Sequence, residues 1–193
     1  MPRSFSILAI CGSTKQRSAN LHLIHAITAM SAGEADVRLY TELMMLPPFS
    51  PDLDTADAPV AVAALRAAIA AADAVLISTP EYAGGVPGVL KNAIDWTVSS
   101  MTFSRKPVAL ITGSTAGRMA HQSLLGTLLI IESRITASTQ LLLPAIQTKV
   151  REGAGIIDTA AKEQVAALLA GLYAIIADVE GNQLDYLPAP PVH

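Results

Sequence analysis

The chain of 193 residues contains a single cysteine and is poor in both aromatic and charged side chains, which make up 4% and 15% of it. One cysteine excludes an internal disulfide framework and favours a reducing compartment, so we expect a cytoplasmic protein. Lysine and arginine total 13 against 16 acidic residues, a net charge of −3. A chain without a basic excess argues against a nucleic-acid partner.

Long apolar runs are also lacking. The apolar run that follows the first four residues is too short for a signal peptide. The most apolar long segment, residues 165–177, has only 13 residues, so we expect a buried helix and no membrane partner. Apolar residues nevertheless make up 51% of the chain, enough for a large core. We therefore predict a single domain over residues 1–193, with a loose proline-rich tail at 187–193.

Short apolar runs alternate with patterns of helical spacing along the chain. Strands are predicted at residues 5–10, 37–40, 74–78, 107–112 and 141–143. Helices are predicted at residues 20–30, 59–72, 89–96, 119–135 and 158–177. This alternation predicts an α/β fold with a five-stranded parallel sheet between two helical layers. One arrangement of such a sheet is the flavodoxin-like strand order 2-1-3-4-5.

The loop after the first predicted strand, residues 11–20, reads CGSTKQRSAN and is almost entirely small or polar. Gly12 permits a tight turn, and Ser18 and Asn20 are good helix N-cap residues. A strand, a polar loop and a helix N-terminus form an anion site suited to phosphate. The Walker pattern is absent, because Gly12 is not followed by a second glycine with Lys and Ser or Thr after it. The dinucleotide glycine pattern is absent too, because Thr14 stands where its second glycine would be. An ordinary capped strand-to-helix turn is the alternative.

Two more polar loops, residues 80–88 and 113–117, follow the third and fourth predicted strands. In the order 2-1-3-4-5, the first, third and fourth strands are neighbours, so the three loops are expected to converge on one pocket. Glycines in the second loop let the backbone approach a flat ring closely. Tyr82 can lie against such a ring or serve as a packing aromatic. Lys91, Asn92 and Asp95 are better explained by helix capping and a salt-bridged helix face.

Three stretches resemble the NAD(P)H-dependent FMN reductase family. Residues 12–20 are similar to its G-S-x-R-x-x-S-x-N fingerprint. Residues 80–96, PEYAGGVPGVLKNAIDW, are similar to P-E-Y-N-x-x-x-P-G-x-L-K-N-A-I-D-W. Residues 46–52 resemble its L-P-x-(Tyr/Phe)-x-x-D segment. Together the three stretches carry a resemblance over roughly residues 5–143.

The resemblance implies a flavodoxin-like fold with bound FMN. The residues that it assigns to the phosphate are Ser13, Lys15, Ser18 and Asn20. Those that border the isoalloxazine ring are Pro80, Glu81, Tyr82, Ala83 and Gly84, with Ser114 completing the cleft. Lys15 replaces an arginine of the family, which removes a two-pronged phosphate contact but keeps the charge, and Arg17 can compensate. Ala83 replaces a common asparagine.

The implied reaction passes hydride from NADPH or NADH to the flavin and then electrons to a quinone, flavin, azo dye or metal oxyanion. No protein acid or base and no metal site are expected. The scattered histidines, His22, His25, His121 and His193, are interpreted as surface or packing residues. The resemblance also implies a homodimer or homotetramer, and the apolar residues 44–49 offer a surface for it.

A phosphatase is one alternative. Cys11 and Arg17 form a C-x5-R pattern that resembles the low-molecular-weight tyrosine phosphatases, in which a thiolate attacks phosphorus. That family also needs an Asp-Pro pair, and the sequence contains none.

A non-enzymatic FMN electron carrier or flavin-binding module is the other alternative. A carrier is expected to surround its flavin with acidic residues for docking. Near these loops the sequence has only Glu81 and Asp95 against Lys15, Arg17 and Lys91.

Overall fold

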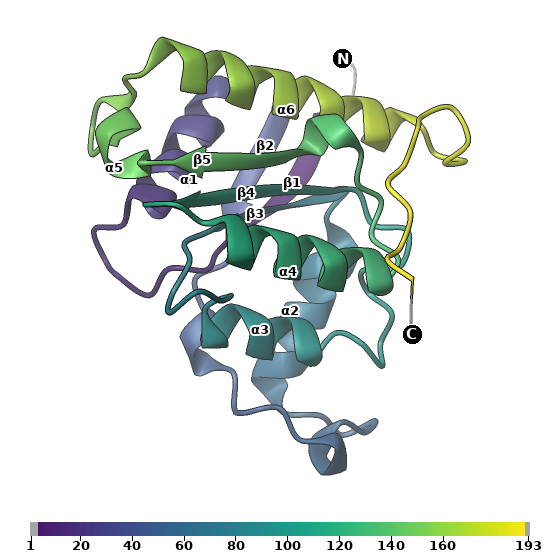
Figure 1. Cartoon of the computed structure of the whole chain (residues 1–193). Helices are drawn as coiled ribbons and strands as arrows, with labels where there is room; N and C mark the ends of the chain where they lie inside the picture. Colours follow the sequence, from purple (N-terminus) through teal and green to yellow (C-terminus); the bar gives the residue numbers. More distant parts are fainter. Residues whose placement is uncertain (1–3, 192–193) are drawn as a thin grey trace.

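The computed structural model describes residues 4–191 and shows a parallel sheet between two layers of helices (Figure 1). The strands are β1 (Phe5–Cys11), β2 (Ala35–Leu39), β3 (Ala74–Thr79), β4 (Val108–Ser114) and β5 (Gln140–Pro144). The helices are α1 (Ala19–Met30), α2 (Val60–Ala71), α3 (Gly88–Asp95), α4 (Arg118–Ile130), α5 (Ile146–Lys149) and α6 (Thr159–Ala177). The sheet order is β2-β1-β3-β4-β5, with every pairing parallel. The predicted flavodoxin-like fold is therefore confirmed.

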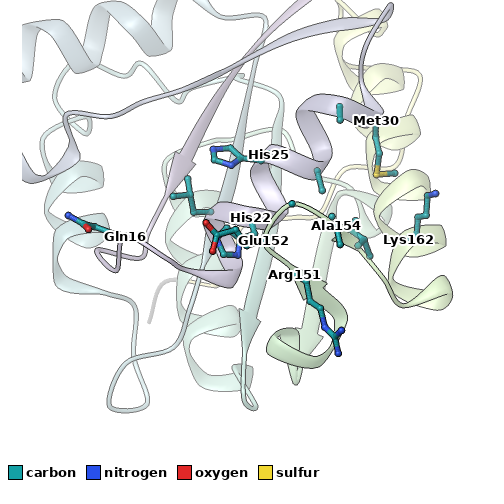
Figure 2. A pocket seen from close by; sticks show the side chains of 14 residues that line it. Gln16, His22, His25, Met30, Arg151, Glu152, Ala154 and Lys162 are labelled. Carbon is teal, nitrogen blue, oxygen red and sulfur yellow. The ribbon is translucent and has the colours of Figure 1, made fainter.

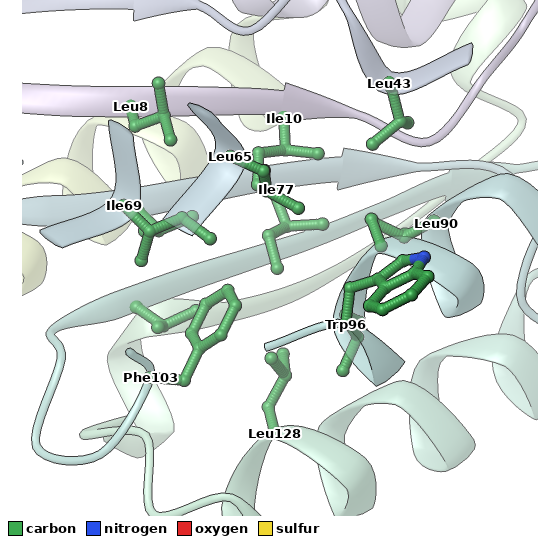
Figure 3. Packing of buried hydrophobic residues seen from close by; sticks show 14 of the residues in the cluster. Leu8, Ile10, Leu43, Leu65, Ile69, Ile77, Leu90, Trp96, Phe103 and Leu128 are labelled. Carbon is green, nitrogen blue, oxygen red and sulfur yellow. The ribbon is translucent and has the colours of Figure 1, made fainter. Parts of the chain in front are cut away.

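Each face of the sheet has its own apolar core, because successive side chains of a strand point to opposite faces. In β1, Ile7 and Ala9 join the cluster under α1 and α6. Leu8 and Ile10 join the cluster under α2, α3 and α4. Figure 3 shows this second cluster, where Trp96 lies among the aliphatic side chains. Both cores cover the central strand β3, so all of its residues are buried.

The predicted helix at residues 119–135 is wrong in its last turn. Helix α4 ends at Ile130, and Glu132 takes a φ of +63° that reverses the chain. Arg134 then lies beside Pro107 in a parallel bridge, and Ile135 is fully buried. Residues 131–135 contain neither glycine nor proline, so the sequence carried no signal that ends the helix.

The expectation that the apolar C-terminal segment is too short to cross a membrane is wrong, because α6 has 19 residues. It is the one helix in residues 4–191 that is long and apolar enough for a span. Six of its side chains are buried at helical spacing, at Ala161, Val165, Leu168, Leu169, Leu172 and Ile175. This stripe packs on the sheet in the apolar core that α6 shares with α1, as expected for one side of a core helix.

The segment expected to be a loose tail begins with an ordered contact. The Leu187 N–H donates to the Ile135 carbonyl at 2.8 Å. Just before it, the Tyr186 hydroxyl donates to Asp178 at 2.7 Å and lies against the guanidinium of Arg134. Residues 192–193 lie outside the described residues, and the single-domain assignment stays a prediction.

Candidate functional site

The carboxyl ends of β1, β3 and β4 open at the same edge of the sheet into a cavity of about 500 Å³, here called the phosphate-loop cavity. Nine of the eleven predicted site residues line it: Ser13, Lys15, Arg17, Ser18, Asn20, Pro80, Glu81, Tyr82 and Ser114. The other two, Ala83 and Gly84, are not part of its lining and lie in the turn that follows Tyr82.

Gly12 sets the path of the chain from β1 into the loop. Its N–H donates to the Ser78 carbonyl at 2.9 Å, which brings the loop against the end of β3. A Cβ at this position would lie 2.3 Å from Thr79 Oγ1, closer than packed atoms approach. Ser18 is buried and caps α1, since its hydroxyl accepts from the Asn20 N–H at 3.2 Å. The positive end of α1 thus borders the cavity, as an anion requires.

Asn20 joins α1 to two strand ends. Its side-chain amide donates to the Gly113 carbonyl at 2.8 Å, and its Oδ1 accepts from the Ser78 hydroxyl at 3.0 Å. The residue is 3% exposed. The resemblance assigned Asn20 to the phosphate, but its amide is engaged with protein. Its side chain therefore holds β3 and β4 in register with the phosphate loop.

The loop after β3 forms a tight two-residue turn. Tyr82 and Gly85 exchange both backbone hydrogen bonds, at 3.0 and 2.9 Å, and the φ angles of Ala83 and Gly84 are +51° and +73°. Two positive φ angles define a type I′ turn, which favours asparagine followed by glycine. The positive φ thus explains why asparagine is common at this position in the family, and alanine adopts this backbone conformation less readily.

Side chains fasten this loop to its neighbours on both sides. The Tyr82 hydroxyl lies 3.2 Å from the Ser13 hydroxyl and so connects the two loops. The Glu81 carboxylate accepts from the Ala120 N–H at 2.9 Å, at the N-terminus of α4. Glu81 is therefore a cap for α4 as well as a residue of the cavity wall.

Replacing Ala83 with glycine or asparagine is expected to raise the free energy of unfolding by about 0.5–1 kcal/mol, because either residue adopts a positive φ more readily than alanine. FMN should bind more tightly, since the turn is then preorganised. Urea unfolding and flavin titration would measure both. Ala83→Val is the opposite control and should weaken both, and equal behaviour of the three variants would contradict the strain at this turn.

Sequence reasoning missed one wall of the cavity, formed by α5 and by the hairpin of β6 (Val150–Arg151) and β7 (Gly155–Ile156). Gln147, Arg151 and Glu152 line the cavity from this side. Strand β5 lies next to β4, so the chain after β5 emerges at the same edge of the sheet. The rule that located the other loops could have located this one.

The histidines that the structure describes have different surroundings. His22, one turn after Ser18, lines the cavity, which its interpretation as a surface or packing residue did not anticipate. His121 is a packing residue, because its ring nitrogens lie 2.9 Å from Thr112 Oγ1 and 2.5 Å from Gln140 Oε1. His193 lies outside the described residues. None of residues 4–191 belongs to a group of three or more metal-ligating side chains.

These donors fit a phosphate monoester that binds without a metal ion. Ser13 and Ser18 supply hydroxyls, α1 supplies its N-terminus, and Lys15 and Arg17 supply exposed cations. Arg17 also lies 3.8 Å from Glu152, an ion pair at the surface. The donor set therefore matches the phosphate of FMN.

The phosphatase alternative does not fit the thiol. Cys11 is the last residue of β1, and its Sγ donates to the Ser13 carbonyl at 3.7 Å. Burial raises the pKa of this thiol, with the opposing hydrogen bond a smaller effect. A phosphatase nucleophile needs a lowered pKa, so Cys11 is a packing residue.

Comparison with known proteins identifies the class that this fold and site define. The chain belongs to the NADPH-dependent FMN reductase family, whose model matches residues 5–147. It is 28% identical over 187 residues to NAD(P)H-dependent FMN reductase PA1204 of Pseudomonas aeruginosa, covering 94% of this chain and 100% of that protein. It is 28% identical over 165 residues to a quinone reductase of Escherichia coli K12, covering 82% and 88%.

Among solved structures, FerB, a flavoenzyme NAD(P)H:(acceptor) oxidoreductase from Paracoccus denitrificans, superposes with a TM-score of 0.70. The two sequences are 25% identical, and the match covers 93% of this chain and all of FerB. The predicted family, the oxidoreductase class and the pairing of FMN with NAD(P)H are thus confirmed.

Proposed function

We propose that this NAD(P)H-dependent FMN oxidoreductase delivers its electrons to a quinone. The observation that carries the proposal is the turn of the second loop, which is built from two small residues without charge. Ala83 and Gly84 form the turn and have positive φ angles. A Cβ on Gly84 would lie 3.5 Å from the sulfur of Met119, whose side chain is exposed. The nearby carboxylate of Glu81 is occupied at α4. A flat, neutral acceptor suits such a surface better than a metal oxyanion does.

Relatives support the same acceptor class. Besides the Escherichia coli quinone reductase, a 2-hydroxy-1,4-benzoquinone reductase of a Burkholderia species is 35% identical over 117 residues, or 59% of this chain. FMN, when bound, supplies hydride and electron transfer at its ring. The chain's own part is to bind and orient: Ser13 and Ser18 hold the phosphate, Lys15 and Arg17 balance its charge, and Tyr82 borders the ring.

The function is tested by anaerobic reduction of the FMN-loaded protein with NADPH and NADH, followed by mixing with each acceptor class. We expect the visible flavin band to bleach and to return fastest with a benzoquinone. A band that returns faster with an azo dye or chromate would overturn the quinone assignment. A band that never bleaches would instead support the electron-carrier alternative.

We infer further that the working unit is at least a homodimer, formed through the apolar loop at residues 43–53, here called the methionine loop. Met44 and Met45 are 63% and 72% exposed, and Leu53 is 49% exposed. Their backbone lies in two short 3-10 helices, η1 (Leu43–Met45) and η2 (Pro51–Leu53). Apolar side chains on an ordered loop are typical of a protein contact surface.

Polar contacts from α3 hold the methionine loop in place. The Pro47 carbonyl accepts from Trp96 Nε1 at 2.8 Å and from Asn92 Nδ2 at 2.9 Å, and Asn92 Oδ1 accepts from the Phe49 N–H at 2.7 Å. Lys91 and Asp95 form the predicted ion pair on this helix, at 2.6 Å. The side chains of Asn92 and Trp96 therefore serve the methionine loop.

An ion pair secures the chain just beyond the methionine loop. Arg66 pairs with Asp54 at 2.5 Å and also donates to the Trp96 carbonyl. The hydrogen bond from Arg66 lowers the pKa of the Asp54 carboxyl below its ordinary value, with Ser99 contributing. The loop is thus ordered before any partner binds, which reduces the entropic cost of association.

Changing Met45 to lysine is expected to shift the protein from dimer to monomer, because a charge would be buried in the contact. Light scattering at micromolar concentration measures the mass, and circular dichroism should stay unchanged. Val179→Lys is the matched control, since Val179 is 74% exposed in another part of the chain. A wild-type monomer, or a dimer that tolerates Met45→Lys, would contradict this interface.

A further inference from the structure

The hairpin of β6 and β7 is packed firmly against α1. A Cβ on Gly155 would lie 3.6 Å from the Ala26 Cβ, so the hairpin and the helix are in close contact there. Val150 is buried in the apolar core that α1 shares with α6, and Ile156 packs against the same core. The N-terminus of α1 borders the phosphate-loop cavity. The hairpin is therefore a fixed wall of that cavity, held in place by the helix that the phosphate loop leads into.

Two charged side chains of the hairpin, Arg151 and Glu152, line the phosphate-loop cavity. Figure 2 shows Glu152 near Gln16 and His22 in this view, and Arg151 extending from the hairpin in another direction. Arg151 is exposed, and its guanidinium makes no hydrogen bond or ion pair with any of residues 4–191. This cation is thus available to an anion in the cavity.

The phosphate loop itself offers no such guanidinium. Lys15 stands where the family has an arginine, and an ammonium group is a point charge that cannot make a two-pronged contact with phosphate. Arg17 was expected to compensate, but it lies 3.8 Å from Glu152, and the two side chains are 82% and 63% exposed. The ion pair draws Arg17 toward the hairpin, so the loop contributes charge without a guanidinium directed at the phosphate.

Arg151 approaches the cavity from the wall opposite in chain order. Lys15 belongs to the loop after β1, whereas Arg151 follows β5 and α5. An anion at the N-terminus of α1 would thus meet positive charge from two separate elements. The planar guanidinium presents parallel N–H groups, which match the oxygens of a phosphate monoester.

From this arrangement we propose that Arg151 supplies the guanidinium for the flavin phosphate that the phosphate loop of this chain lacks. Glu152 keeps Arg17 at the hairpin, where Arg17 acts on the phosphate at longer range. The inference rests on FMN binding at the phosphate-loop cavity. It makes the hairpin, together with the loop, responsible for the preference for a phosphorylated flavin.

Quenching of flavin fluorescence tests the proposal, with FMN and riboflavin titrated separately into flavin-free protein. Arg151→Gln is expected to weaken FMN by about tenfold and riboflavin by less than about twofold, because riboflavin lacks the phosphate. Arg151→Lys keeps the charge and should weaken FMN by only about threefold. Lys15→Arg, added to Arg151→Gln, provides a guanidinium from the loop and should restore FMN affinity to within about threefold of wild type.

Lys149→Gln is the matched control, because it removes a positive charge two residues before Arg151 from a side chain that does not line the cavity. It should leave the affinity for both flavins unchanged. The proposal is overturned if Arg151→Gln binds FMN as wild type does, weakens riboflavin as much as FMN, or is not rescued by Lys15→Arg. Equal weakening of FMN by Lys149→Gln would overturn it too. Wild-type protein that binds neither flavin would instead refute flavin binding at this cavity.

Discussion

Gly12→Ala is expected to abolish detectable FMN binding and to lower the free energy of unfolding by about 1–3 kcal/mol. The added Cβ would lie 2.3 Å from Thr79 Oγ1 and 2.8 Å from Thr79 Cβ, atoms of a fully buried residue at the end of β3. Neither the strand nor the side chain has room to retreat. The phosphate loop must then move away from β3, which separates the hydroxyl groups that the phosphate needs.

Urea unfolding and flavin titration measure the two effects of Gly12→Ala separately. Gly88→Ala is the matched control, because a Cβ there meets nothing within 4 Å and Gly88 begins α3. This control should bind FMN normally and be slightly more stable, since alanine favours the helix. Normal FMN affinity in Gly12→Ala would show that the loop does not depend on its close approach to β3.

Asn20→Ala is expected to lower the free energy of unfolding by about 3 kcal/mol and to weaken FMN binding strongly. The change removes one amide that serves two buried partners, the Gly113 carbonyl and the Ser78 hydroxyl. Both partners lose a hydrogen bond that is shielded from water, because Asn20 is 3% exposed and Ser78 is fully buried. The ends of β3 and β4 then lose their common link to α1.

A double-mutant cycle with Ser78→Ala distinguishes this clamp from a direct phosphate contact. If Asn20 acts through the strand ends, Ser78→Ala alone should weaken FMN binding, and the two changes together should be less than additive. Riboflavin, which lacks the phosphate, should be affected as FMN is. An effect of Asn20→Ala confined to FMN, with unchanged stability, would show that Asn20 binds the phosphate directly.

Local pattern accounts for much of the agreement between sequence and structure. The strand at residues 74–78 was predicted because its continuous apolarity requires cover on both faces, and β3 is buried throughout. The strand order came from the resemblance to the FMN reductase family, and it brings three distant loops to one cavity. Nine of the predicted site residues line that cavity for this reason.

Other features depended on contacts that no local pattern carries. The last predicted turn of α4 failed because Glu132 takes a positive φ and Arg134 pairs beside Pro107. The wall of the phosphate-loop cavity at residues 150–156 contains two strands of two residues each, which are too short to show a periodicity. Glu81 faces α4, and its partner Ala120 lies 39 residues away.

The sequence by itself determined the class of fold, the family and the set of loops that meet at the phosphate-loop cavity, because these follow from apolar periodicity and from motifs of short range. Only the tertiary structure decided what several motif residues do. Asn20 is a clamp rather than a free phosphate ligand, and Asn92 and Trp96 secure the methionine loop. The physical reason is that a side-chain amide or indole serves whichever partner the fold places within about 3 Å, and that partner is chosen by packing across the sheet.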